Sequence, residues 1–150
     1  MPSQSLNFDV AGTPIPQGSM VSNGRGRGLR YSNDKKLKEW RYLLIEEMRR
    51  IKPEDWNADG VITVSAVFRF NRPKSHFGTG RNSAQLKDSA PEFHTVKPDA
   101  DKLQRSVGDS VEASGLCKGD QQIVSWNTCK RWVIGNEPPG VLLTITCVTP

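Results

Sequence analysis

The segment from Val61 to Phe70 constrains the fold of this chain more than any other. Its sequence, VITVSAVFRF, carries an apolar residue at every second position, which is typical of a β-strand with one buried face. The residues on that face are Ile62, Val64, Ala66, Phe68 and Phe70. A strand of this kind needs a second layer over its apolar face, and segments with a helical period are the natural source of that layer.

The first helical pattern runs from about Asp34 to Ile51. Apolar residues recur there at steps of three or four and form a single stripe. The stripe consists of Leu37, Trp40, Leu44, Met48 and Ile51. Ser32 or Asn33 is expected to cap this helix, and Pro53 lies just beyond its end. We expect the stripe to pack in the core.

The second helical pattern runs from Asp101 to about Ala113, and Gly115 is its expected stop. Its apolar positions, four residues apart, are Leu103, Val107 and Val111. Its charged positions, on nearly the opposite face, are Asp101, Arg105 and Asp109. Packing the apolar stripe on a sheet therefore points the charged side chains away from the core.

Three further segments predict strands. Near the N-terminus, Leu6, Phe8 and Val10 alternate with polar residues, and residues 122–134 and 141–148 read as two strands joined by the turn NEPPG. We expect these last two strands to form a C-terminal β-hairpin. The predicted fold is one small α/β domain over residues 1–150, with a mixed β-sheet, two main helices packed on it and that hairpin.

Two basic segments, at about residues 18–33 and 71–97, are expected to be mobile loops. In the first, Arg25, Arg27 and Arg30 lie among glycines, so these arginines can adapt to a phosphate backbone. A disordered surface loop is the alternative interpretation. The basic residues of the second segment are Lys74, Arg81, Lys87 and Lys97.

The charge balance favours a polyanionic partner. Lys and Arg number 21 against 16 Asp and Glu, which gives a net charge of +5. Such an excess fits nucleic acid better than an anionic small molecule, because phosphate neutralisation by Lys and Arg drives nucleic-acid affinity. An ordinary basic protein with no such partner has the same balance and remains the alternative.

Cysteine usage and apolar segments argue against several classes of protein. Cys117, Cys129 and Cys147 form no C-x-x-C pair, and His76 and His94 are far apart, so neither a disulfide framework nor a zinc site is expected. No apolar stretch approaches the roughly 20 residues of a membrane span, and the N-terminal sequence has no signal-peptide pattern. We therefore expect a reduced, cytoplasmic protein.

Three aspartates carry the chemistry that the sequence suggests. Asp99 and Asp101 flank one alanine at the start of the second helix, and Asp120 precedes the next apolar segment. Mg²⁺ usually takes one or two carboxylates together with water and substrate phosphate, and a metal held in this way can activate water. The alternative interpretation is helix capping, for which aspartate is a common residue.

The run from His94 to Lys130 resembles the RusA-type Holliday-junction resolvases, small Mg²⁺-dependent endonucleases often encoded by phages and prophages. The family pattern is K-P-D-x-D-N-L-x-K, then D-A-L, then D-D-x-Q-[I/V] and a lysine on a strand. The matching residues here are Lys97, Pro98, Asp99, Asp101, Leu103, Asp109, Asp120, Gln122, Ile123 and Lys130. The segment from Phe8 to Pro16 also resembles the family's opening strand, F-x-V-x-G-x-P-x-P.

The chain departs from the family pattern at three positions. Lys102 stands at the family's asparagine, Arg105 at its catalytic lysine, and Gly119 at the first aspartate of D-D-x-Q. Arginine keeps the positive charge but cannot give up a proton as a lysine can. The aspartate that family members use as a metal ligand corresponds to Asp120, so we expect the metal site to be kept.

The resemblance implies a Mg²⁺-dependent, structure-specific endodeoxyribonuclease that resolves four-way (Holliday) junctions by paired phosphodiester hydrolysis in DNA recombination and repair. It implies a homodimer in a bacterial cell, with a phage or prophage as one source. Asp99, Asp101 and Asp120 would bind Mg²⁺, with Mn²⁺ as the alternative, and Arg105 would complete the catalytic set near the scissile phosphate. The residues expected to contact DNA are Lys97, Lys102, Lys130, Arg25, Arg27 and Arg30.

Other functions stay open at this point. One is junction binding without cleavage, and another is a different Mg²⁺-dependent nuclease or an unrelated D-x-D metal enzyme that acts on nucleotides or sugars. Trp126 and Trp132 are expected to pack in the core or in an interface, with base stacking as the alternative.

Overall fold

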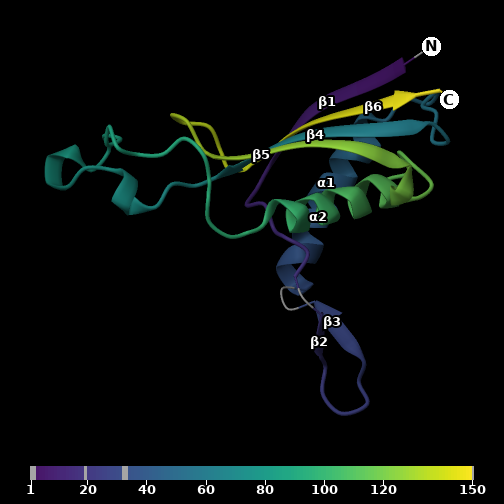
Figure 1. The fold of residues 1–150 in the computed structure, drawn as a ribbon, viewed down its shortest axis with the longest axis horizontal. Helices are drawn as coiled ribbons and strands as arrows, with labels where there is room; N and C mark the ends of the chain where they lie inside the picture. The colour runs from purple at the N-terminus through teal and green to yellow at the C-terminus, as the bar shows by residue number, and fades with distance from the viewer. Residues whose placement is uncertain (1–2, 19, 32–33, 150) are drawn as a thin grey trace.

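A mixed four-stranded sheet is the centre of the protein, as a computed structural model shows for residues 3–18, 20–31 and 34–149 (Figure 1). The strands lie in the order β1-β6-β4-β5. Their bounds are β1 Ser3–Ala11, β4 Val61–Phe70, β5 Ile123–Trp132 and β6 Gly140–Val148. The β4–β5 pair is parallel, and β6 is antiparallel to both of its neighbours. The predicted fold class, a mixed sheet with two main helices, is confirmed.

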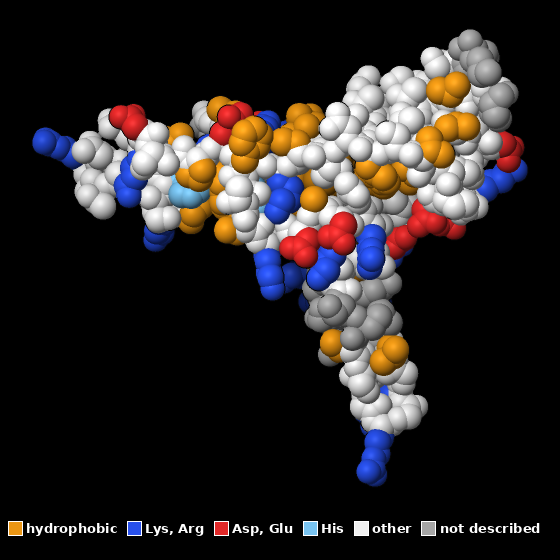
Figure 2. Space-filling model, in the orientation of Figure 1, with side chains coloured by type: hydrophobic (Ala, Val, Ile, Leu, Met, Phe, Trp, Pro, Cys, Tyr) orange, Lys and Arg blue, Asp and Glu red, His pale blue; other side chains and the backbone are white. Residues whose placement is uncertain are grey.

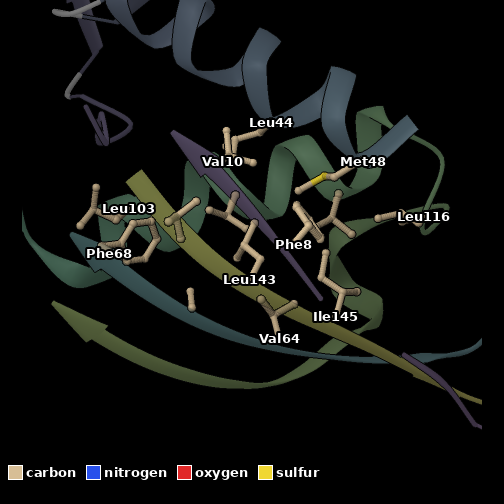
Figure 3. Close-up of a cluster of buried hydrophobic side chains, with 14 of the residues drawn as sticks. Phe8, Val10, Leu44, Met48, Val64, Phe68, Leu103, Leu116, Leu143 and Ile145 are labelled. Carbon is tan, nitrogen blue, oxygen red and sulfur yellow. The ribbon is translucent and has the colours of Figure 1, made fainter. Parts of the chain in front are cut away.

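Two helices, α1 (Asp34–Ile51) and α2 (Ala100–Ala113), cover one face of this sheet. Their apolar stripes face the predicted apolar side of β4, and side chains from both layers meet in one core (Figure 3). Leu44 and Met48 of α1 and Leu103 and Val107 of α2 are fully buried. Burying a side chain of this size contributes about 1.5–3 kcal/mol, so the two stripes hold the helices in place.

The expected C-terminal hairpin is wrong in its pairing. Both strands exist, but β5 and β6 are not neighbours, because β4 lies between them and pairs with each. The turn after β5 therefore carries the chain across β4 instead of folding it straight back. The physical reason is burial: β4 is the strand with the most complete apolar face, and the middle of the sheet is where that face is covered best.

The segment at 18–33, expected as a loop, contains a second, two-stranded sheet. Strands β2 (Met20–Ser22) and β3 (Leu29–Tyr31) pair antiparallel, and the amide of Asn23 donates to the carbonyl of Gly28 at 2.9 Å. Gly26 in the connecting turn has a φ of +67°, which favours glycine. This β2–β3 hairpin projects away from the body of the protein (Figure 1). The expected cap residues Ser32 and Asn33 lie outside the described residues.

The second basic segment, at 71–97, also extends to one side of the sheet (Figure 1). Short 3₁₀ helices span Lys74–His76 and Gly80–Asn82. The segment is fastened at its base, where the Arg72 guanidinium donates to the carbonyls of Val133 at 2.9 Å and Pro91 at 2.6 Å. His94 is buried, and its ring stacks on Phe70 at a centroid distance of 4.0 Å.

Candidate active site

A single pocket lies between α2 and the start of β5. Four of the residues that line it belong to α2, where steps of three or four residues place them on one face of the helix. The lining residues are Asp101, Gln104, Arg105, Gly108, Asp120, Ile123 and Trp126. Of the residues predicted to be catalytic, Asp101, Arg105 and Asp120 are therefore brought together, although Asp120 is far from the other two in sequence.

Asp99 occupies a different position from the other two aspartates. It is the N-cap residue of α2 by backbone geometry, with φ −70° and ψ 143°, yet its carboxylate makes no capping hydrogen bond. Capping therefore does not account for the side chain. Asp99 does not line the pocket. Its carboxylate acts on Lys130 instead, where it partly opposes the lowering of the pKa by burial.

Lys130 holds the segment that leads into α2. Its ammonium group donates to the carbonyl of Val96 at 2.8 Å and to that of Pro98 at 2.6 Å. Burial lowers the pKa of Lys130, and the Asp99 carboxylate opposes that shift. Two of the three ammonium donors are thus engaged with backbone, so this lysine, predicted as a DNA contact, fixes the position of the residues just before Asp99.

Gln122 fixes the position of the turn that carries Asp120, the second carboxylate of the pocket. Its side-chain oxygen accepts from the amides of Lys118 at 2.8 Å and Gly119 at 3.1 Å. Its amide nitrogen donates to the carbonyls of Ala58 and Gly60, both at 2.9 Å. One side chain therefore ties the turn that carries Asp120 to the loop before β4. The glutamine of the D-x-Q pattern was visible in the sequence, but its role was not.

Asp109 lies on the same helix as Asp101, about two turns further along. Burial raises the pKa of the Asp109 carboxyl, Arg41 lowers it, and the carboxylates of Asp120 and Glu112 raise it. The interaction with Asp120 shows that the negative charge of the pocket extends to this residue. Carboxylates that raise one another's pKa in this way repel each other, and a bound cation would relieve that repulsion.

The pocket suits a hard divalent cation whose coordination sphere is completed by the substrate. Among the described residues, no three His, Cys, Asp or Glu side chains converge as a ready-made metal site. Mg²⁺ commonly takes only one or two carboxylates and fills its remaining positions with water and phosphate. Asp101 and Asp120 fit that donor set, and the expected third ligand, Asp99, lies outside the pocket lining.

Basic side chains lie next to this acidic pocket and also on the projecting β2–β3 hairpin. Figure 2 shows acidic and basic side chains next to one another over α2, near the point where the β2–β3 hairpin joins the body. Lys97, Arg25 and Arg27 are exposed, Lys102 is half-buried, and the side chain of Arg30 is outside the described part of the chain. Positive charge therefore flanks Asp99 and Asp101 in the sequence, at Lys97 and Lys102, and recurs in the turn of the hairpin, at Arg25 and Arg27.

Four pocket residues were not predicted as part of the site: Gln104, Gly108, Ile123 and Trp126. Gln104 and Gly108 carry no chemistry that marks them in a sequence, although both share the helical face of Asp101. Trp126, expected in the core or in an interface, is half-buried and forms part of the pocket wall, whereas Trp132 is buried. The sequence contained one signal, the spacing of three, four and seven residues from Asp101 to Gln104, Arg105 and Gly108.

Comparison with known proteins gives the family of this chain. A pocket that combines carboxylates with an arginine suits the binding of a cation and a phosphate. The family model described as endodeoxyribonuclease RusA matches residues 11–146, which include the whole pocket. The chain belongs to the RusA endodeoxyribonuclease family, and this membership supports nuclease activity. No curated protein matches the chain. None of the described helices is both long and apolar enough to cross a membrane.

Proposed function

We propose that this protein resolves four-way DNA junctions by paired phosphodiester hydrolysis, and that it requires Mg²⁺ or, alternatively, Mn²⁺. The observation that carries the proposal is the convergence of Asp101, Arg105 and Asp120 on one pocket in a chain of the RusA family. Carboxylates that hold a cation and a guanidinium that faces a phosphate suit the hydrolysis of a phosphodiester. Four-way junctions arise in DNA recombination and repair, which is where we place the activity.

Asp101 and Asp120 are the residues that we assign to the cation. Asp99 is a third candidate, because it directly precedes α2 and its side chain makes no capping bond. When bound, the metal supplies an activated water and neutralises developing phosphate charge. The protein's own contribution is to hold the two carboxylates on a helix and on a turn that Gln122 fastens at four backbone groups.

Arg105 lies one helical turn after Asp101, is exposed, and lines the same pocket. We assign it to the scissile phosphate, which a guanidinium can bind with two parallel hydrogen bonds. An arginine stays charged at every accessible pH, so its role is to orient the phosphate and stabilise charge, and it does not donate a proton. Proton transfer to the leaving oxygen then falls to water.

The predicted DNA-contacting basic residues, other than Lys130, would bind the duplex arms of the junction. Lys97 and Lys102 flank the aspartates, and Arg25, Arg27 and Arg30 belong to the β2–β3 hairpin and its turn. Lys130 is assigned to holding the 96–98 segment, since its ammonium already donates to two carbonyls. A homodimer would present the same pocket twice, which suits a substrate with two-fold symmetry.

Cleavage of a synthetic four-way junction, with and without Mg²⁺, tests this proposal. The control is a linear duplex that contains the same arm sequences. We expect nicks in two opposed strands of the junction, only when the metal is present, and no cutting of the duplex. Equal cleavage of both substrates would indicate a general nuclease. Tight junction binding without cleavage would indicate the second candidate, a binding protein, which Arg105 at the family's lysine position favours.

A further inference from the structure

Trp126 is placed differently from the other tryptophans of the chain. Trp40, Trp56 and Trp132 are only 2%, 8% and 9% exposed and belong to the core. Trp126 packs against the edge of that core, is only half-buried, and shares a pocket with Asp101 and Arg105. Part of the indole ring is thus open to solvent inside a charged pocket.

Gly108 is the reason that this surface is open. A Cβ atom at position 108 would lie 3.6 Å from Cζ2 of Trp126 and 3.8 Å from Cδ1 of Ile123, so any longer side chain would cover the indole ring. The side-chain amide of Gln104 donates to the Thr128 hydroxyl at 2.7 Å, and this hydrogen bond holds the helix against the strand. The pocket therefore has an apolar wall, built by Trp126 and Ile123, beside its charged groups.

A cation and a phosphate do not require an apolar wall. A nucleobase does, because its flat face stacks on an aromatic ring whatever the base. The lining of this pocket combines carboxylates, a guanidinium and an indole, which match a cation, a phosphate and a base of one nucleotide. Moving a base out of a duplex costs the pairing and stacking that it loses, and it costs least where the base is already unpaired.

We propose that Trp126 stacks on an unpaired base adjacent to the scissile phosphate and so positions that phosphate against Arg105 and the carboxylates. This inference rests on the proposed function. Trp126 then acts as a positioning and specificity-determining residue: it favours cleavage where a base can leave the helix, and it disfavours cleavage within a fully stacked duplex.

A double-mutant cycle, in which a protein variant is combined with an altered substrate, tests this proposal. Cleavage rates are measured for wild type and Trp126→Ala on an intact junction and on junctions with one abasic site, placed in turn at each nucleotide beside the cut. We expect Trp126→Ala to slow cleavage of the intact junction by about 5- to 150-fold, the range of a single base–aromatic stack. At one position, the abasic substrate should slow the wild type similarly and leave the variant unchanged.

Two control variants separate stacking from folding. Trp126→Phe keeps an aromatic face and should retain most of the rate. Val124→Ala changes an exposed residue of the same strand that does not line the pocket, and should behave as wild type. In an Asp101→Asn background, which is expected to bind without cutting, junction binding should quench tryptophan emission, and Trp126→Phe should remove that quenching because the other tryptophans are buried.

The outcomes are distinguishable. A wild-type protein that neither binds nor cuts junctions overturns the proposed function and this inference together. A wild-type protein that cuts, with each abasic site slowing wild type and Trp126→Ala by the same factor or slowing neither, leaves the function standing and overturns stacking in favour of a packing role. Unchanged quenching in the Trp126→Phe variant contradicts the inference even if Trp126→Ala fails to fold.

Discussion

Asp101 and Asp120 reach the same pocket from a helix and from a turn, and their charge is the feature we expect catalysis to need. Asp101→Asn keeps the shape of the side chain and removes the charge. We expect this variant to lose metal-dependent cleavage and to keep junction binding, as measured by gel cleavage and by filter binding. Asp59→Asn is the control, because Asp59 is exposed and pairs with Lys118 outside the pocket. Cleavage by Asp101→Asn at the wild-type rate would rule out its assignment as a ligand.

Two substitutions of Arg105, to alanine and to lysine, test the role of this single residue. If its guanidinium stabilises phosphate charge, Arg105→Ala should slow single-turnover cleavage by roughly 10²–10³, as when one preorganised donor is lost. Arg105→Lys should retain much of the rate, because lysine is the residue of the family pattern. Arg49→Ala, which changes an exposed arginine of α1, should have little effect. Full activity of Arg105→Ala would mean that Arg105 is only a solvated charge on the helix.

The sequence could predict Asp101, Arg105 and Asp120, because each belongs to a spaced pattern of charged residues whose chemistry is recognisable. It could not place Asp99 outside the pocket, since its two-residue offset from Asp101 points it to another side of the helix start. Trp126 and Gly108 became site residues only through the way α2 lies against β5. That arrangement depends on contacts between residues that are far apart in the sequence, and a local sequence pattern does not predict such contacts.

At the scale of elements, Gly108 is a glycine in the middle of α2 without a conformational need for one. A Cβ there meets only ordinary van der Waals contacts, at 3.6 Å and beyond. Gly108→Ala should therefore stabilise the protein by about 0.5–1 kcal/mol through the lower entropy of the unfolded chain. Thermal unfolding followed by circular dichroism should show a Tm higher by about 1–4 °C.

Gly140→Ala is the matched control for that prediction. Its Cβ would collide with the backbone carbonyl of Val10 on the neighbouring strand, so this variant should be destabilised. A Gly108→Ala variant that is less stable than wild type would mean that the pocket is more tightly closed than the structure indicates.

His94 links the 71–97 segment to the sheet and gives the fold a pH dependence. Burial and the nearby Lys130 ammonium lower the pKa of His94 from its ordinary 6.5, and its ring packs against Phe70 and Trp132. Below pH 6.5 the unfolded chain binds a proton that the folded chain does not bind, so the free energy of unfolding falls as the pH drops through this window.

Urea unfolding at about pH 7.5 and about pH 5.5 measures this effect. The loss of stability on acidification should be smaller in His94→Gln than in wild type. His76→Gln should also reduce the loss, because burial and the positive charges of Arg72 and Lys87 lower the pKa of His76 as well. An identical loss in wild type and in His94→Gln would assign the acid sensitivity to other groups.

Local periodicity predicted the helices and β4 well, because each has one apolar face that must be buried. It failed for β5 and β6, whose short connection suggested a hairpin. Strand pairing depends on which strand occupies the middle of the sheet. Here β4, which comes much earlier in the chain, lies between β5 and β6. The glycine-rich segment at 18–33 was expected as a loop because β2 and β3 are only three residues each, too short to show alternation.

At the scale of the whole molecule, the net charge of +5 and the projecting hairpin predict salt-sensitive DNA binding. The logarithm of the affinity for duplex arms should fall by about 0.9 per phosphate contact for each unit of log salt concentration. Replacing Arg25, Arg27 and Arg30 by alanine should flatten that slope, while the preference for a junction over a linear duplex should survive. Anisotropy titrations at several salt concentrations provide the measurement.

The matched control replaces Lys35, Lys36 and Lys38 by alanine, an equal loss of charge at the start of α1. An unchanged slope for the hairpin variant would show that the hairpin does not touch DNA. Sedimentation of the wild-type protein as a monomer at working concentration would contradict the dimeric arrangement.

The root of the hairpin has a consequence for where a cut can fall. The amide of Gln17, just before β2, donates to the carbonyl of Lys102 at 3.0 Å, next to Asp101 in the first turn of α2. The projecting hairpin and the pocket are thereby anchored to the same helical turn. If the hairpin contacts a duplex arm, as we propose, this hydrogen bond links the contacted nucleotides to the position on the backbone that the pocket reaches.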